Sequence, residues 1–187
     1  MFKRIFDIVI SFTALLLVGS IFFLSWIVVA IDTKKNGFFR QERIGQFGKP
    51  FKIVKFRTIT CSKSGINHIS TLGRWMRSSK MDELPQLWNI FIGDMSFVGP
   101  RPDVAGYYDL LTGAERKILY LKPGLTSLAS IKYANEEDVL SKQKNPLRYN
   151  DNIIFPDKVK MNLEYYYSHS LFGDFKIIMK TIFRNNE

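Results

Sequence analysis

The chain has 187 residues, 46% of them hydrophobic, and a formal net charge of +10. This length suits one domain of roughly 150 residues with a short additional segment. The single cysteine, Cys61, excludes an internal disulfide, and with only two histidines the usual zinc sites are excluded as well. The sequence has neither a Gly-rich Walker loop nor a GxGxxG pattern, so the common nucleotide-binding motifs have no support.

The first predicted element is an uncharged apolar stretch at residues 8–31. As a straight helix it would extend about 36 Å, enough to cross the hydrocarbon core of a bilayer. A buried core helix is one alternative, although so long an uncharged stretch is rare in a small soluble domain. A cleaved signal peptide is another, and the length of the stretch disfavours it. We therefore predict a membrane anchor at residues 1–33.

Basic residues flank this stretch on both sides, with Lys3 and Arg4 before it and four Lys or Arg residues at positions 34–43 after it. The positive-inside rule prefers the second flank for the cytoplasmic side, yet both flanks are basic. A re-entrant helix, which enters the bilayer, bends and returns, would satisfy both. We predict the bend at Gly19 and Ser20, because Gly and Ser pairs permit kinks. A straight spanning helix remains the alternative.

A strongly basic region follows the apolar stretch. Between residues 34 and 80 there are twelve Lys or Arg residues and a single acid, Glu42. Such a run is often only a solvated face. Directly after an apolar segment it favours contact with anionic lipid headgroups or with a phosphate substrate. Charge alone also leaves nucleic acid open.

We predict that residues 34–187 form a small α+β domain that is mostly helical. Two short strands at residues 38–44 and 50–58 flank a Gly-rich turn, and a polar loop is expected at 62–67. We expect helices at residues 72–79, 82–92, 103–121 with a break at 112–115, 136–144 and 158–167 and around 175–184, with another strand at 127–132. The helix at 72–79 and the last helix are amphipathic and cationic. Each is expected either to cover the core or to lie in the bilayer interface.

The segment at residues 81–86, MDELPQ, is the most informative part of the sequence. Pro85 is tolerated in a first turn, so the helix is predicted to begin at Asp82 and to stop at Gly93. Asp82 then either caps the helix or serves a ligand. Adjacent residues of a regular helix do not share a face, so Asp82 and Glu83 can converge on one ligand only at an irregular helix end.

Arginines surround this pair of carboxylates, with Arg77 before it and Arg101 after it. A guanidinium group binds phosphate oxygens through two parallel donors. Carboxylates set among arginines therefore suggest a nucleophile or a metal ligand that acts on phosphate.

Five blocks resemble, in order, the bacterial sugar transferase family: residues 38–45 (FFRQERIG), 50–58 (PFKIVKFRT), 81–86 (MDELPQ), 93–102 (GDMSFVGPRP) and 122–126 (KPGLT). Each block alone is weak, but together they cover almost the whole chain. The chain resembles the minimal, single-domain form of the monotopic polyprenyl-phosphate phosphoglycosyl transferases. This resemblance implies a membrane-inserted, re-entrant N-terminal helix, a cytoplasmic catalytic domain at residues 34–187, interfacial amphipathic helices and a short β element.

The resemblance also implies an activity, which is the transfer of sugar-1-phosphate from a UDP-sugar to undecaprenyl phosphate with release of UMP. The implied location is the cytoplasmic face of the bacterial inner membrane. The reaction would begin assembly of a capsule, O-antigen, exopolysaccharide or glycoprotein glycan. The sugar is not identified, with an N-acetylated or amino-deoxy hexose as the expectation and a plain hexose such as galactose as the alternative. A homodimer is left open.

By the same resemblance, Asp82 matches the nucleophile that forms an aspartyl-phosphosugar intermediate. Glu83 matches the second acid, which helps to deprotonate or position the lipid phosphate. The implied cofactor is Mg²⁺, held by Asp82 and the diphosphate of the donor. The residues that would bind the substrate phosphates are Arg77, Arg101, Lys55 and Arg57.

Two features depart from the family pattern. The family often breaks its membrane helix with a Ser-Pro pair, whereas this chain has Gly19 and Ser20 followed by Ile21. Many members continue the last block with Gly-Trp, whereas this chain has Ser127 and Leu128. The first departure leaves the re-entrant topology open, and the second leaves the donor sugar open.

Two other function classes compete with the transferase. One is a non-catalytic adaptor that binds anionic lipid through its basic face, and the other is a membrane-tethered nucleic-acid binder with salt-dependent affinity. Neither gives the Asp-Glu pair or the Pro-Arg-Pro block a role. The transferase, without nucleic acid as a partner, is therefore our prediction.

Overall fold

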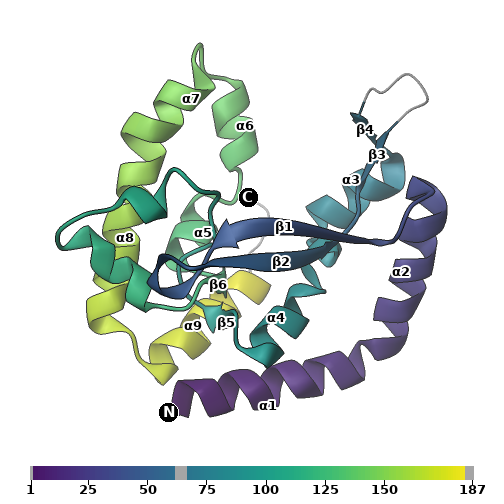
Figure 1. The fold of residues 1–187 in the computed structure, drawn as a ribbon, viewed down its shortest axis with the longest axis horizontal. Helices are drawn as coiled ribbons and strands as arrows, with labels where there is room; N and C mark the ends of the chain where they lie inside the picture. Colours follow the sequence, from purple (N-terminus) through teal and green to yellow (C-terminus); the bar gives the residue numbers. More distant parts are fainter. Residues whose placement is uncertain (1, 62–66, 184–187) are drawn as a thin grey trace. The chain divides into compact units, whose positions relative to one another are not determined.

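The computed structural model describes residues 2–61 and 67–183, which are mostly helical and contain three two-stranded sheets (Figure 1). This confirms the predicted helix-rich α+β class. The chain divides into two compact units. One consists of Met1–Arg43 and Phe51–Met95, and the other of Ile44–Pro50 and Ser96–Glu187.

The first unit begins with two helices, α1 (Phe2–Leu17) and α2 (Gly19–Thr33), which are bent by 66° at their junction (Figure 1). The break falls at Val18, next to the predicted Gly19 and Ser20, so the predicted bend is confirmed. Within residues 2–61 and 67–183, no single helix is long and apolar enough to cross a bilayer. Among the described residues, only α1 and α2 taken together reach the required length and composition.

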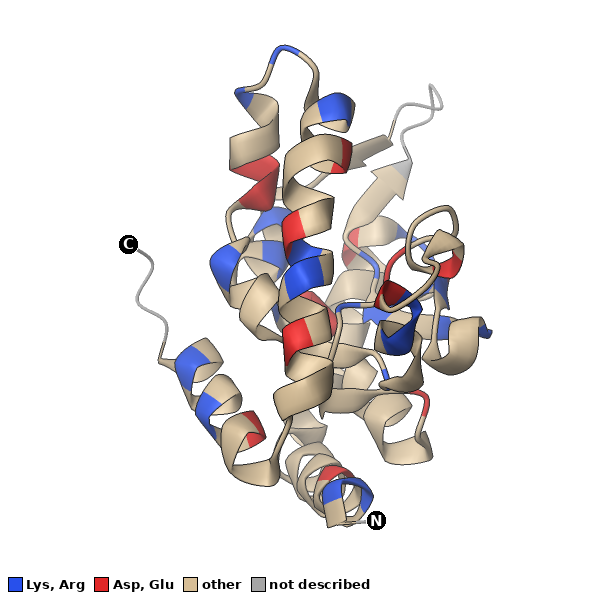
Figure 2. Cartoon of the chain, turned by 90° about the vertical axis from the view of Figure 1, so that its left-hand side faces the viewer, with Lys and Arg blue, Asp and Glu red and all other residues tan. Residues whose placement is uncertain are grey.

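The bent pair exposes a large apolar surface. Figure 2 shows that the charged residues of α1 gather toward its N-terminal end, and the rest of the helix is uncharged. Around the junction the exposed fractions reach 67% for Leu16, 76% for Leu17 and 60% for Leu24. Soluble proteins rarely leave contiguous apolar patches of this kind uncovered. The pair therefore presents a surface that suits an apolar environment.

Both ends of the bent pair are fastened to the first unit. Arg4 of α1 donates through Nη1 to the carbonyl of Ile90 (2.6 Å) and through Nη2 to that of Phe91 (2.7 Å), at the end of α4 (Gln86–Ile92). This places a cation at a helix C-terminus, where carbonyl groups lack partners. At the end of α2, Asp32 accepts a hydrogen bond of 2.7 Å from Ser70, the N-cap of α3 (Thr71–Ser78).

The core of the first unit lies between α2, α3 and the strand β2 (Pro50–Phe56), which pairs with β1 (Phe38–Ile44) as predicted. Val29, Phe56 and Met76 are buried there. Trp75, next to Met76 on α3, is exposed, so this helix both covers the core and leaves an aromatic side chain free for an interface.

A short hairpin of β3 (Ile59–Cys61) and β4 (Asn67–Ile69) was not predicted. Most of the polar loop predicted at 62–67 lies outside the described residues.

The helix predicted at residues 82–92 begins later than expected. Met81–Glu83 form a 3₁₀ turn, η2, Pro85 occupies the N-cap, and α4 starts at Gln86. The N–H groups of Leu84 and Leu87 donate to the carbonyl groups three residues earlier, Met81 and Leu84, so the chain before α4 follows 3₁₀ rather than α-helical geometry. The helix ends at Gly93 with a left-handed φ of 99°, which confirms the predicted stop.

In the second unit, β5 (Ser96–Val98) pairs in parallel with β6 (Gly124–Thr126). The GPRP and KPGLT blocks meet at this sheet. A side chain at Gly99 or Gly124 would collide with the backbone of the other segment. The two glycines of these blocks are therefore explained by a close approach of two backbones.

Two predictions in the second unit are wrong. Residues 103–121 do not form an α-helix, since they contain only the 3₁₀ segments η3 (Tyr108–Leu110) and η4 (Glu115–Tyr120). Gly113 adopts positive φ within the predicted break, and Gly106 adopts positive φ where no break was predicted. The strand predicted at 127–132 is instead the helix α5 (Leu128–Lys132), because Ser127 accepts a hydrogen bond from the Ser130 N–H and caps it.

The remaining helices agree with the sequence in outline. They are α6 (Glu136–Ser141), α7 (Pro146–Tyr149), a π-helical turn η5 (Asn150–Ile154), α8 (Phe155–Ser168) and α9 (Leu171–Ile182). Ile177 of α9 packs with Val98 and Tyr165 in a buried cluster. Phe172 and Phe175 of the same helix are exposed, so α9 covers the core with one face only.

Replacing Arg4 with Gln should lower the free energy of unfolding of the first unit by about 2 kcal/mol, because two charge-assisted hydrogen bonds to α4 are lost. Denaturant unfolding in detergent micelles measures this. Arg40→Gln removes an exposed arginine of β1 and serves as the matched control. Equal stabilities of the two variants would contradict the assigned role of Arg4.

Candidate active site

Asp82 and Glu83 emerge from the 3₁₀ turn η2 rather than from a regular helix. Both are buried, with exposed fractions of 7% and 8%. Lys80, directly before the turn, has a left-handed φ of 59°, a conformation that costs a non-glycine residue about 1 kcal/mol. No side chain caps α4, so the alternative that Asp82 is only a helix cap is wrong.

Three cations lie around the two carboxylates. The ammonium group of Lys55 on β2 is 3.4 Å from Glu83 Oε1, and both side chains are largely buried. Burial raises the pKa of Asp82, and the neighbouring charge of Glu83 raises it further. Lys55, Lys80 and Arg77 act in the opposite direction on the same pKa. The result is a desolvated carboxylate beside positive charge, an environment typical of functional sites.

Asp82 also carries a buried oxygen without a partner. Its Oδ1 atom makes no hydrogen bond to any residue that the structure describes. Most buried polar atoms in proteins are satisfied, and leaving one unsatisfied costs free energy. A bound cation or a substrate group would supply the missing contact.

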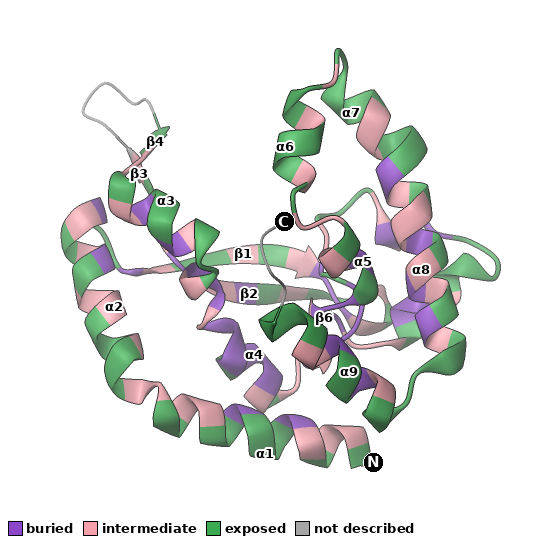
Figure 3. Cartoon of the chain, turned by 180° about the vertical axis from the view of Figure 1, so that it is seen from behind, coloured by how far each residue is buried: buried purple, intermediate pink, exposed green. Residues whose placement is uncertain are grey.

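Asn89 fixes the position of α4 relative to β2. Its Oδ1 accepts a hydrogen bond from the Val54 N–H (3.0 Å), and its Nδ2 donates to the Lys52 carbonyl (2.9 Å). Figure 3 shows α4 as mostly buried. Since Lys55 follows Val54 and Glu83 precedes α4, these bonds set the distance between the two charges. Sequence analysis missed Asn89, whose only signal is a polar residue within the apolar run QLWNIFI.

The other predicted phosphate-binding residues are placed differently. Arg77 lies in the last turn of α3, and its guanidinium group makes no hydrogen bond or ion pair with another described residue. Arg57 donates to the carbonyl groups of Asn36 and Phe38, both at 3.0 Å, so part of its guanidinium holds the backbone at the start of β1. Arg101 belongs to the second unit, where it lines a small cavity with Tyr108.

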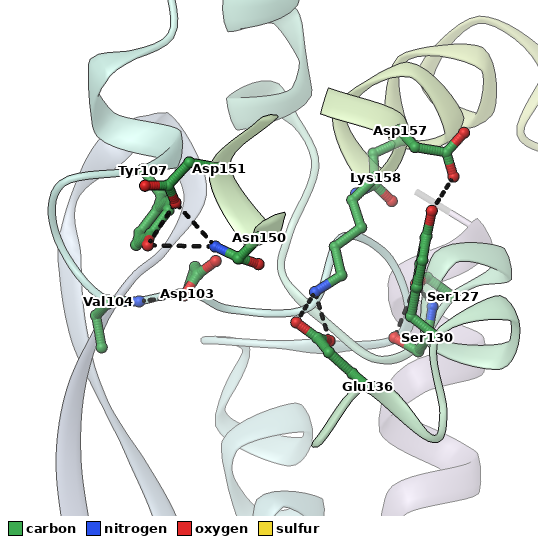
Figure 4. A network of polar contacts seen from close by, with 12 residues as sticks. Asp103, Val104, Tyr107, Ser127, Ser130, Glu136, Asn150, Asp151, Asp157 and Lys158 are labelled. Atoms are coloured by element: carbon green, nitrogen blue, oxygen red, sulfur yellow. Dashed lines mark hydrogen bonds and ion pairs between the residues drawn. The ribbon is translucent and has the colours of Figure 1, made fainter. Parts of the chain in front are cut away.

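The segment of the second unit that departs from the family pattern is held by polar contacts (Figure 4). Lys158 of α8 lies 2.6 and 2.7 Å from the two carboxylate oxygens of Glu136. Asp157 accepts hydrogen bonds of 2.7 Å from Lys132 and from the hydroxyl of Tyr133. These contacts fasten α5 and α6 to α8, so the chain that follows Ser127 and Leu128 has a defined structure.

Comparison with known proteins agrees with the sequence motifs. The family model described as "Bacterial sugar transferase" matches residues 1–186. The chain is 35% identical over 202 residues to a UDP-glucose:undecaprenyl-phosphate glucose-1-phosphate transferase of Klebsiella pneumoniae. It is 30% identical over 195 residues to a protein of the same name from Caulobacter vibrioides. It is 28% identical over 204 residues to the galactosyl transferase CpsE of Streptococcus agalactiae.

These alignments cover 98%, 96% and 96% of this chain. They cover 40%, 68% and 41% of the three relatives, in the same order. The chain thus spans less than half the length of two of these relatives.

Asp82→Asn should raise the thermal stability of the protein at pH 7. A carboxyl whose pKa is raised by folding binds its proton more tightly in the folded state, so its contribution to stability falls as pH rises from the unfolded pKa through the folded pKa. The neutral Asn side chain avoids this loss. Melting temperatures measured from pH 3 to 8 should diverge as pH rises, with the variant above the wild type. A variant less stable than wild type at pH 7 would contradict the assigned environment.

Proposed function

The chain belongs to the bacterial sugar transferase family, and on this basis we propose that it transfers sugar-1-phosphate from a UDP-sugar to undecaprenyl phosphate. The products are UMP and undecaprenyl-diphosphate-sugar. The names of the Klebsiella and Caulobacter relatives support this reaction class. The observation that carries the proposal is the buried Asp82–Glu83 pair beside Lys55, Lys80 and Arg77.

In the first step of the proposed mechanism, a carboxylate oxygen of Asp82 attacks the sugar-linked phosphorus of the donor. A bond forms between that oxygen and phosphorus, and the bond from phosphorus to the bridging oxygen breaks. UMP leaves with the electron pair of the broken bond. Lys55, Lys80 and Arg77 offset the negative charge that two anionic reactants bring together.

In the second step, an oxygen of the undecaprenyl phosphate attacks the same phosphorus. The bond to Asp82 breaks, and its carboxylate is regenerated. Glu83 accepts the proton of the acceptor phosphate and orients it. Its contact with Lys55, at 3.4 Å, holds the carboxylate in place for this role.

We further propose Mg²⁺ as the cofactor. The unpartnered Oδ1 of Asp82 is the kind of oxygen ligand that Mg²⁺ takes. Within the described part of the chain, no three His, Cys, Asp or Glu side chains gather as a metal-binding group. This fits an ion bound by one carboxylate, the donor diphosphate and water, which is common for Mg²⁺. The ion would supply neutralisation of phosphate charge.

We propose that residues 1–33 form a re-entrant membrane anchor and that residues 34–187 act on the cytoplasmic face of the bacterial inner membrane. The exposed apolar surface of α1 and α2 supports insertion. Arg4 is bonded to α4 and Asp32 to Ser70, so both ends of the bent pair are tied to one compact unit. A spanning helix would have to separate these ends by the thickness of the bilayer.

Two further helices are proposed to lie in the membrane interface. Trp75 of α3 is 54% exposed, and Phe172 of α9 is 69% exposed with the ammonium group of Lys176 4.5 Å from its ring centre. Aromatic rings beside cations are typical of helices at the headgroup level.

UMP release from a panel of UDP-sugars with Mg²⁺ tests the proposed reaction. The panel includes glucose, galactose and N-acetylated hexoses, because the named relatives differ in sugar. Turnover should require undecaprenyl phosphate, and without it the wild type should release about one UMP per enzyme. Asp82→Asn should lose both signals, by at least about 10³-fold.

Glu83→Gln should separate the two steps. It should keep the stoichiometric UMP release and lose turnover by about 10²- to 10⁴-fold, because only the second step uses the proton acceptor. A folded wild type that binds lipid but releases no UMP from any donor would instead favour the adaptor function. Unchanged turnover in Asp82→Asn would exclude the covalent route.

Cysteine labelling tests the topology. Single cysteines at Phe2 and Lys35, in a Cys61→Ser background, should react with a membrane-impermeant reagent from the same side of inverted vesicles. Labelling from opposite sides would contradict the re-entrant anchor.

A further inference from the structure

The side-chain amide of Gln86 is a second unsatisfied group in the same block as Asp82. Gln86 is 2% exposed, and its Nε2 makes no hydrogen bond with any other described residue. Buried amides are normally paired, because an unpaired N–H keeps the full cost of losing water. The block at residues 81–86 therefore contains one buried acceptor without a donor, Asp82 Oδ1, and one buried donor without an acceptor.

The backbone brings Gln86 to the side of the turn that carries Glu83, the neighbour of Asp82 in the chain. Hydrogen bonds between residues three apart connect η2 to α4. Leu84 N–H donates to the Met81 carbonyl (3.2 Å), and Leu87 N–H donates to the Leu84 carbonyl (3.0 Å). In such tight turns, side chains three residues apart lie on the same side. Gln86 follows Glu83 by three residues and Asp82 by four.

We propose that Gln86 is a catalytic residue whose Nε2 donates a hydrogen bond to a non-bridging oxygen of the transferred phosphoryl group. The proposal rests on the function given above, in which that group becomes bonded to Asp82. An oxygen on the attacked phosphorus lies next to the Asp82 carboxylate, and it gains negative charge as the bond to UMP breaks. A preorganised neutral donor stabilises this charge without adding a cation that would pair with Asp82 or Glu83.

The position is inconsistent with a purely structural role for the amide. Asn89, three residues later in the same helix, is equally buried, and both ends of its amide are bonded to β2. Gln86 makes no such bond with the described chain and would gain stability if it were apolar. A buried, unpaired amide one turn after the Asp82–Glu83 pair is better explained by a ligand that arrives during the reaction.

The test is Gln86→Met, which keeps the length of the side chain and removes the donor. UMP release is followed without acceptor, using the UDP-sugar selected from the donor panel. The rate of the stoichiometric release should fall by about 10²- to 10³-fold, with little change in the KM for donor during turnover. The melting temperature should stay equal to that of the wild type or rise.

Asn89→Leu is the matched control, because it removes a buried amide that is hydrogen-bonded. It should lower the melting temperature. A fall in both rate and melting temperature for Gln86→Met would mean a structural role, and an unchanged rate would mean no role; either result overturns the proposal. Absence of UMP release from the wild type would overturn both the proposed function and this inference. The two contrary results for Gln86→Met would overturn the inference alone.

Discussion

The attachment of α4 to β2 through the buried amide of Asn89 is the constraint on which the candidate site depends. The residues that carry charge come from separate segments, with Asp82 and Glu83 before α4 and Lys55 on β2. A shift of α4 along the strand would move Glu83 away from Lys55 and change the field at Asp82. Because Asn89 bonds both a donor and an acceptor of β2, such a shift would break two hydrogen bonds at once.

The opposite end of α4 is held by α1. Arg4 occupies the carbonyl groups of Ile90 and Phe91, and the ring of Phe12 stacks on Phe91 with a centroid separation of 5.9 Å. The helix that follows the two carboxylates, α4, is therefore fixed by the Asn89 hydrogen bonds to β2 on one side and by contacts with α1 on the other. In the proposed function, α1 both inserts in the bilayer and, through Arg4 and Phe12, holds the helix that follows the two carboxylates.

The sequence predicted the parts of the structure that depend on local chemistry. The apolar stretch with its bend, the β1–β2 hairpin and the stop at Gly93 follow from composition, turn residues and glycine conformation. The errors came from local features that apolar periodicity does not reveal. Ser127 caps a helix where a strand was predicted, and Gly106 adopts positive φ within the segment predicted as a helix at 103–121, outside its predicted break. Neither a cap nor a left-handed glycine is evident from apolar periodicity.

The candidate site was only partly predicted, because some of its residues are close in sequence and others are brought together by packing. Asp82, Glu83 and Arg77 are close in sequence, and the motif identified them. Lys55 could be placed beside Glu83 only once the packing of β2 was known. Arg4, Asn89 and Gln86 were missed as site residues, because their importance lies in hydrogen bonds made, or left unmade, between distant segments.

The central claim is that Asp82 becomes covalently bonded to the sugar phosphate. The most direct measurement is mass spectrometry of the intact protein and its peptides after incubation with the UDP-sugar and Mg²⁺ but without acceptor. The account predicts a mass increase equal to one sugar phosphate, located on the peptide that contains Asp82 and removed by undecaprenyl phosphate. An adduct on another residue, or turnover with no adduct on the rapidly quenched enzyme, would contradict it.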